Sequence, residues 1–143
     1  MEVEILLVED DPNDLELTLR ALRKKNIANR IEVARDGVEA LDYIFCSGEH
    51  QQRQIEEQPR LVMLDLKLPR VDGMDVLQKI KSDERTRHIP VVVLTSSGEE
   101  KDINRAYDLG VNSFVTKPVD FQQFTDTIGQ LGAYWVQLNK ATA

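Results

Sequence analysis

The sequence predicts a doubly wound α/β domain, with a five-stranded parallel sheet and helices on both of its faces. Two observations support this fold class. Five short runs with strand character alternate along the chain with stretches whose apolar residues have helical spacing. Three of these runs, with the sequences ILLV, LVML and VVVL, are continuously apolar, which is typical of strands covered on both faces.

The strands are predicted at residues 4–9, 30–35, 60–65, 90–95 and 112–116. Apolar residues at helical spacing, such as Leu15, Leu19 and Leu22, indicate a helix after each of the first four strands and after the last. With right-handed crossovers and helices on both sides, the simplest strand order is the flavodoxin-like order 2-1-3-4-5. No linker, repeat or low-complexity segment divides the chain, so we expect residues 1–143 to form one domain.

Capping residues mark where the helices begin. Asp11 followed by Pro12 places a hydrogen-bond acceptor at the N-cap and proline at the first helical position. Further starts are predicted at Asp72 and at two pairs with capping-box spacing, Ser97 with Glu100 and Asp120 with Gln123. The polar stretch 46–59 is longer than most connections, and we expect a helix extension and an exposed loop there.

The composition is that of one acidic globular domain. The 143 residues include 18 Lys and Arg against 25 Asp and Glu, which gives a formal net charge of −7. With 41% hydrophobic residues the chain can bury a core without disulfides or a structural metal. Phosphate backbones are bound by clustered Lys and Arg, so this balance argues against nucleic acid as a partner.

We expect neither secretion nor membrane insertion. The start of the chain has no basic region, and its longest apolar runs are far shorter than a membrane span. The single cysteine, Cys46, allows no internal disulfide and no CxxC zinc motif. The cytoplasm is therefore the expected compartment.

Ligands of open parallel sheets bind outside the carboxyl ends of the strands, and several predicted strands end in polar residues. The first strand is followed by Glu9 and Asp10, the third ends in Asp65, the fourth in Thr95, and the fifth is followed by Lys117. Carboxylates that converge on one edge need a cation, and a small set of oxygen ligands suits Mg²⁺. Lysine and threonine can offset the oxygens of a phosphoryl group, and a carboxylate can be its acceptor.

Each of these residues alone has a simpler explanation. Acidic residues after a strand are more often helix caps, as Asp11 is expected to be, and a single lysine such as Lys117 is usually solvated. Thr95 could simply end a strand. Asp65 fits such an explanation least, because it follows a buried run, where an unpaired charge is costly. Four such residues at four strand ends favour a functional site.

With these residues in place, the chain resembles the receiver domains of response regulators in two-component, phosphorelay signal transduction. The similarity covers residues 3–130 and rests on the motifs LLVEDD, ARDGVEAL, LVMLDLKLPRVDG, VVVLTSS and AYDLGVNSFVTKP. It implies a phosphoprotein that takes a phosphoryl group from a sensor histidine kinase. Such domains catalyse their own Mg²⁺-dependent phosphorylation and dephosphorylation without being turnover enzymes.

The resemblance also implies a role for each residue of the acidic edge. Asp65 corresponds to the phosphoacceptor. Glu9 and Asp10 correspond to the acidic pair, with Asp10 as a direct Mg²⁺ ligand. Lys67 would offer its backbone carbonyl to the metal, and Asp65 would be a ligand as well.

Three further residues correspond to the switch of this family. Thr95 is expected to supply a hydroxyl that moves toward the phosphoryl group, and Phe114 an aromatic ring that rotates in response. Lys117 is expected to pair with the phosphoryl group. The bond between Lys117 and Pro118 is commonly cis in the family, so we expect it to be cis here.

The C-terminal segment predicts a protein contact. An apolar stripe at helical spacing indicates a long helix over about residues 119–139, with only residues 139–143 after it, so we expect no output domain. Four residues lie past the usual end of a receiver's last helix, three of them in the stripe and Tyr134 beside it. We expect these four to form a homodimer interface: Leu131, Tyr134, Trp135 and Leu138. This tail and the 46–59 stretch most resemble single-domain regulators that pair with bacterial phytochromes.

Two other classes of protein are alternatives. Phosphatases with an aspartate nucleophile have a DxD pattern, in which a second aspartate follows the nucleophile two places later. Here Asp65 is followed at that position by Lys67, which makes the phosphatase the weaker alternative. A phosphorylation-independent binding module, a pseudo-receiver, is the stronger alternative. It has no chemical need for all of Asp10, Asp65, Thr95 and Lys117, and the intact set therefore favours a phosphorylated receiver.

Overall fold

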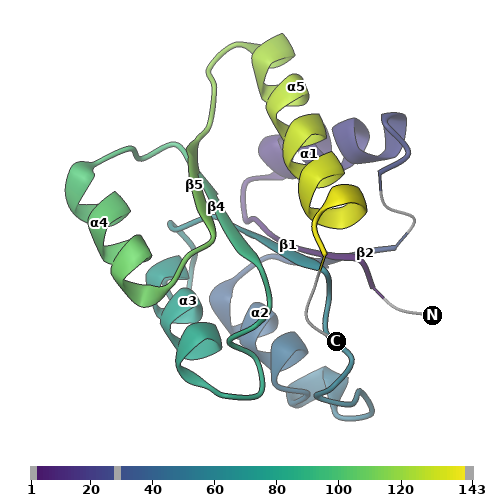
Figure 1. Ribbon diagram of the computed structural model, residues 1–143, viewed down its shortest axis with the longest axis vertical. Coiled ribbons are helices and arrows are strands. Elements are labelled where there is room, and N and C mark those ends of the chain that lie inside the picture. Colours follow the sequence, from purple (N-terminus) through teal and green to yellow (C-terminus); the bar gives the residue numbers. More distant parts are fainter. Residues whose placement is uncertain (1–2, 28–29, 141–143) are drawn as a thin grey trace.

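The computed structural model describes residues 3–27 and 30–140. Over this part of the chain, five parallel strands form one sheet in the order β2-β1-β3-β4-β5, which confirms the predicted order (Figure 1). The strands are β1 (Ile5–Val8), β2 (Ile31–Ala34), β3 (Leu61–Leu64), β4 (Val91–Thr95) and β5 (Ser113–Thr116). All five predicted strands are found within about one residue of their expected bounds.

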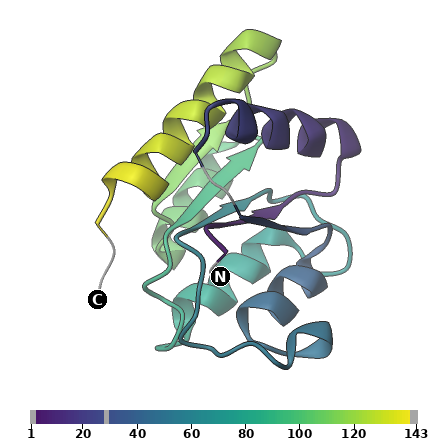
Figure 2. The same cartoon turned by 90° about the vertical axis from the view of Figure 1, so that its right-hand side faces the viewer.

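Helices cover both faces of the sheet, as predicted. The α-helices are α1 (Pro12–Lys24), α2 (Gly37–Ile44), α3 (Gly73–Ser82), α4 (Glu100–Leu109) and α5 (Phe121–Gly132). Helices α1 and α5 lie side by side on one face, and α2, α3 and α4 lie on the other (Figures 1 and 2). None of the described helices is both long enough and apolar enough to cross a bilayer.

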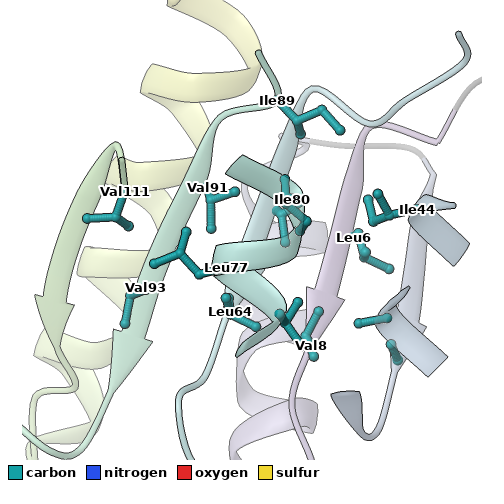
Figure 3. Packing of buried hydrophobic residues seen from close by; sticks show 14 of the residues in the cluster. Leu6, Val8, Ile44, Leu64, Leu77, Ile80, Ile89, Val91, Val93 and Val111 are labelled. Atoms are coloured by element: carbon teal, nitrogen blue, oxygen red, sulfur yellow. The ribbon is translucent and has the colours of Figure 1, made fainter. Parts of the chain in front are cut away.

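The apolar strands divide their side chains between two cores, which explains their continuous hydrophobicity. In β1, Leu6 and Val8 face the core under α2 and α3, while Ile5 and Leu7 face the core under α1 and α5. Figure 3 shows Leu6 and Val8 beside Ile44, Leu77 and Ile80 of the covering helices. Because successive side chains of a strand point to opposite faces, both faces of these central strands are buried.

Aspartate caps begin most of the helices. Asp11, Asp72 and Asp120 accept hydrogen bonds from backbone N–H groups of α1, α3 and α5, as predicted. The capping box predicted at Ser97 is wrong, because the cap of α4 lies two residues later, at Glu99, and the Ser97 hydroxyl lies 3.4 Å from Asp102 Oδ2. The cap of α2, Asp36, has the same chemistry and was not predicted from the sequence.

The 46–59 stretch is a largely exposed loop that side-chain contacts tie to the end of α2. The Arg53 guanidinium lies 3.7 Å from the centre of the Tyr43 ring and donates to the Tyr43 and Glu57 carbonyls. Gln58 Nε2 donates to the Ile44 carbonyl at 2.7 Å. The stretch also contains a short 3₁₀ turn, η1 (Gly48–His50). The exposed loop is therefore confirmed, whereas the predicted helix extension is wrong, because α2 ends at Ile44 and only the 3₁₀ turn follows.

Helical structure continues past α5 into a π-helical segment, η2 (Ala133–Leu138). Val136 of this segment is buried in the core under α1 and α5. Its carbonyl accepts a hydrogen bond of 3.0 Å from Arg60 Nη1, next to the start of β3. The segment therefore lies at the amino-terminal edge of the sheet.

Candidate functional site

Three carboxylates meet at the carboxyl edge of the sheet. Strands β1 and β3 pair in parallel with Val8 opposite Leu64, so Glu9 and Asp65, the next residues of each strand, lie side by side. The Asp65 N–H donates to the Val8 carbonyl at 3.1 Å, which holds the two ends together. Oxygen atoms of Glu9, Asp10 and Asp65 lie within 4.8 Å of one another. Glu9 and Asp65 are buried, and Asp10 is exposed to solvent.

Lys117 enters this cluster from the end of β5. Its Nζ lies 2.6 Å from Glu9 Oε1 and 2.9 Å from Asp65 Oδ2. A third carboxylate, Asp14 of α1, accepts from Nζ at 2.9 Å. The Lys117 N–H donates to the Thr95 carbonyl at 2.7 Å, so the lysine is also fixed through its backbone.

Asp14 is a site residue that the sequence reasoning missed. It lies in the first turn of α1, and a pattern of polar residues at strand ends does not include that position. The available signal is that α1 begins directly after the Glu9–Asp11 segment. An acidic residue in the first turn of such a helix lies close to the same edge of the sheet.

The ionisation of the site reflects its burial. Burial, together with the charge of Asp65, raises the pKa of Glu9 to about 7 against the opposing effect of the Lys117 hydrogen bond. Burial works against the charge of Lys117 too, but its hydrogen bonds with Glu9, Asp14 and Asp65 are stronger and raise the pKa of Lys117 above its usual value. Three carboxylates thus contact one ammonium group, Asp10 lies beside two of them, and the site carries excess negative charge.

The donor chemistry of the cluster fits a hard divalent cation. Carboxylate oxygens are the ligands that Mg²⁺ and similar ions prefer, and Asp10 leaves one side of the cluster open to water and to further ligands. A cation at Glu9, Asp10 and Asp65 would offset the negative charge that Lys117 alone leaves unbalanced. The residues present here therefore suit such a metal.

Three other predicted site residues belong to β4, to β5 and to the segment after β3. Thr95, at the end of β4, is fully buried, and its Oγ1 accepts a long hydrogen bond of 3.4 Å from the Ser97 N–H. Phe114 in β5 is half-buried against the core under α2, α3 and α4. The Lys67 N–H donates to Asp65 Oδ1 at 3.3 Å, while its side chain is exposed.

The peptide bond between Lys117 and Pro118 is trans, and the expectation of a cis bond is wrong. No cis peptide bond occurs in residues 3–27 and 30–140. The trans form is the more stable isomer of a bond before proline, by about 0.5–1 kcal/mol.

The four predicted interface residues lie away from the acidic cluster. Tyr134 and Leu138 are 50% and 70% exposed, as expected of a contact surface. Leu131 and Trp135 are half-buried against the core under α1 and α5, and the Trp135 ring makes an edge-to-face contact with Tyr134. The π-helical segment therefore turns only part of the predicted stripe toward solvent.

Comparisons with known proteins identify relatives of the whole chain. Residues 5–129 match the response regulator receiver domain family. The probable methanogenesis regulatory protein FilR2 of Methanothrix harundinacea is 44% identical, over 96% of this chain and 86% of FilR2. The response regulator Rcp1 of Synechocystis is 35% identical, over 93% of this chain and 88% of Rcp1.

Solved structures extend the similarity to the fold. The Mn²⁺-bound form of Rcp1 has a TM-score of 0.90 at 33% identity and covers 99% of both chains. The phosphorylated cyanobacterial phytochrome response regulator RcpA has a TM-score of 0.91 at 36% identity and covers 100% of both. The bacteriophytochrome response regulator AtBRR has a TM-score of 0.76 at 56% identity and covers 98% of this chain and 99% of AtBRR.

These relatives confirm both the family and the narrower resemblance that the sequence predicts. RcpA and AtBRR are phytochrome response regulators, and each is matched over nearly its full length. Both the sequence match and the fold cover the edge of the sheet where Glu9, Asp10 and Asp65 meet. The chain belongs to the response regulator receiver family.

Proposed function

We propose that Asp65 accepts a phosphoryl group from the phosphohistidine of a sensor histidine kinase. The observation that carries this proposal is the Lys117 ammonium group, 2.9 Å from Asp65 Oδ2 at an acidic edge of the sheet. A buried lysine beside a carboxylate offsets charge that develops on a transferring phosphoryl group. The phosphorylated state of RcpA, which shares this fold, supports the same role here.

In the proposed transfer, an oxygen of Asp65 attacks phosphorus, and the bond from phosphorus to the kinase imidazole breaks. The imidazole leaves with the electron pair of that bond, and an acyl phosphate forms on Asp65. Lys117 neutralises part of the charge of the phosphoryl oxygens. Thr95 supplies a hydroxyl donor to them.

The metal that suits this chemistry is Mg²⁺, which keeps some of its ligand positions for water and phosphate oxygens. Asp10 and Asp65 would hold it directly, together with the Lys67 carbonyl, and Glu9 would complete the acidic pair. When bound, Mg²⁺ offsets the negative charge of the carboxylates and the phosphoryl group. With the metal, the chain would catalyse its own phosphorylation and dephosphorylation.

We propose that the phosphoryl group acts as a switch on the face formed by α4, β5 and α5. Thr95 moves toward the new dianion and leaves space into which Phe114 rotates. Phe114 is half-buried in β5, so a rotation of its ring would alter the surface between α4 and α5. The output is then a protein contact of this face.

A phytochrome is the proposed class of cognate kinase. RcpA and AtBRR, two phytochrome response regulators, match this chain over 100% and 98% of its length. The kinase would dock along α1, beside the acidic cluster. Such a signalling role places the protein in the cytoplasm, which its single cysteine also favours.

The decisive experiment is intact-mass spectrometry after incubation with acetyl phosphate, with and without Mg²⁺. We expect a gain of one phosphoryl group that requires Mg²⁺ and that Asp65→Asn abolishes. Asp75→Asn, an exposed aspartate of α3, is the matched control and should be phosphorylated like the unchanged protein. Folded protein that gains no phosphoryl group and binds no Mg²⁺ would instead support the pseudo-receiver alternative.

We also propose that the chain forms a homodimer through Leu131, Tyr134, Trp135 and Leu138. The exposed rings and side chains of Tyr134 and Leu138 support this surface. Sedimentation equilibrium should show a dimer that the double substitution Tyr134→Ser and Leu138→Ser weakens by tenfold or more. Val119→Ser removes an apolar side chain elsewhere that is even more exposed and should leave the equilibrium unchanged. A monomer at micromolar concentration would contradict the proposal.

A further inference from the structure

The hydrogen-bonding capacity of the Lys117 ammonium group is fully used before any phosphoryl group arrives. An ammonium group has three N–H donors. The three acceptors of Lys117 Nζ are Glu9 Oε1 at 2.6 Å, Asp14 Oδ2 at 2.9 Å and Asp65 Oδ2 at 2.9 Å. Any new acceptor must therefore replace one of these carboxylates or draw the ammonium group away from it.

Phosphorylation of Asp65 changes what the ammonium group must reach. The acyl phosphate has lost the carboxylate charge, and the new charge lies on phosphoryl oxygens beyond Oδ2. Lys117 has to follow that charge, since a charge-assisted hydrogen bond depends steeply on distance. The other two carboxylates, Glu9 and Asp14, hold the ammonium group in its position in the unphosphorylated protein.

Of these two carboxylates, Asp14 is the easier to release. The Glu9 side chain is 5% exposed, so a Glu9 carboxylate without its lysine would stay largely desolvated. The Asp14 side chain is 30% exposed, and water can replace the hydrogen bond that it loses. Asp14 belongs to α1, whereas Glu9 and Asp65 directly follow strands of the sheet.

The backbone of Asp14 is held independently of its side chain. Its N–H donates to the cap residue Asp11 at 3.3 Å, and its carbonyl accepts from the Thr18 hydroxyl at 2.8 Å. A change of the carboxylate to an amide therefore preserves the start of α1. The effect of such a change on the site can be measured in a folded protein.

We infer that Asp14 is a positioning residue of the phosphoryl site. Its carboxylate holds the Lys117 ammonium group close to α1 and competes with the phosphoryl group for that ammonium group. The inference rests on the proposed function, since it assumes a phosphoryl group on Asp65. Phosphorylation then breaks an ion pair between α1 and the segment after β5. The carboxylate of Asp14 thereby sets how tightly the site holds a phosphoryl group.

The test is the affinity for fluoroberyllate, a mimic of the phosphoryl group, in saturating Mg²⁺, measured by calorimetry. Asp14→Asn should bind the mimic roughly three- to tenfold more tightly than the unchanged protein, because Lys117 is then free to move. Glu16→Gln is the matched control, since it removes a negative charge two residues along α1 that pairs with Arg20 at 2.8 Å. It should leave the affinity unchanged.

Salt distinguishes competition for Lys117 from general repulsion of the mimic. In 0.5 M KCl the screening length is about 4 Å, so a repulsion that acts through solvent disappears, while a short contact persists. A gain in affinity that persists at high salt supports the inference. Equal or weaker binding by Asp14→Asn, or a gain that disappears in salt, overturns it.

Failure of the proposed function gives a different result. In that case the unchanged protein would bind no fluoroberyllate in Mg²⁺, and the inference would be refuted together with the function. Asp14→Ala serves as a second variant and should behave as Asp14→Asn does. If the two variants moved the affinity in opposite directions, a packing effect of residue 14 would be responsible and the inference would be wrong.

Discussion

Glu9 experiences opposing influences from its neighbours. Burial favours its protonated form, Asp65 adds to that preference, and Lys117 at 2.6 Å favours the carboxylate. The balance raises the pKa of Glu9 to about 7, well above its usual value of 4.5. In the metal-free protein, Glu9 therefore gains or loses a proton close to neutral pH.

The raised pKa of Glu9 predicts how stability depends on pH in EDTA. Between about pH 4.5 and pH 7 the folded protein binds more protons than the unfolded chain, so the free energy of unfolding falls as pH rises through this window. One such group contributes at most about 1.4 kcal/mol per pH unit. Denaturant titrations at several pH values should show this decline.

Two variants assign the decline to Glu9. Glu9→Gln has no proton to lose, so its free energy of unfolding should fall less steeply with pH over the same window. Glu16→Gln removes an exposed carboxylate of α1 and should keep the slope of the unchanged protein. Equal slopes for Glu9→Gln and the unchanged protein would contradict the assignment.

At the scale of residues, the strand-end argument finds much of the site but not all of it. Parallel strands end at a common edge, and this alone brings Glu9, Asp10 and Asp65 together. Asp14 required knowledge of how the first turn of α1 is oriented over that edge. The place of Asp14 in the first turn puts it near this edge, but which side of α1 faces the edge depends on tertiary packing, which a single sequence does not specify.

Among the elements, α3 makes an unusually close approach to the loop after β3. The first residue of α3, Gly73, has no side chain, and a Cβ atom placed there would lie 2.2 Å from the Asp65 carbonyl oxygen and 2.6 Å from Leu66 Cα. Both contacts are with backbone, which cannot move aside cheaply. Helix α3 therefore lies directly against the backbone of the proposed phosphoacceptor.

This close approach predicts opposite effects for two glycine substitutions. Gly73→Ala should lower the free energy of unfolding by about 2 kcal/mol or more, since the helix and the Asp65 loop must separate. The Cβ atom of Gly129→Ala in α5 would meet only the flexible side chain of Lys25, at 3.4 Å. This substitution should therefore raise the free energy of unfolding by about 0.5–1 kcal/mol. Chemical denaturation measures both. A neutral Gly73→Ala would mean that α3 can move away from Asp65 freely.

Prediction of the elements from sequence succeeds where a local signal is strong. The strands follow from runs of apolar residues, and the caps at Asp11, Asp72 and Asp120 follow from short-range chemistry. The start of α4 was predicted too early, because Ser97 matched a capping pattern that the backbone does not use. The 46–59 stretch is organised by Arg53 and Gln58 over distances of 4 to 14 residues, which local patterns do not show.

For the whole molecule, the site joins elements that are far apart in the sequence. Strands β1, β3 and β5 and helix α1 all contribute to the hydrogen bonds of Lys117. The chain already carries a net charge of −7, and four of its carboxylates gather here around a single ammonium group. A ligand that offsets this charge should stabilise the folded molecule as a whole.

Stability in the presence and absence of Mg²⁺ tests this link. An ion that binds only the folded protein raises the free energy of unfolding by about 2.7 kcal/mol at a concentration of 100 times its Kd. The midpoint temperature of thermal unfolding should therefore rise with Mg²⁺ and return to its original value in EDTA.

Asp10→Asn should abolish most of this shift, because it removes a proposed ligand that does not bond to Lys117. Its stability in EDTA should not fall, since the substitution relieves repulsion from Glu9 and Asp65. Asp11→Asn changes the adjacent residue, which caps α1, and asparagine caps a helix about as well, so this control should keep the full response to Mg²⁺. An Asp10→Asn protein that responds to Mg²⁺ like the unchanged one would place the metal elsewhere, and Lys117 alone would then offset the negative charge of the acidic edge.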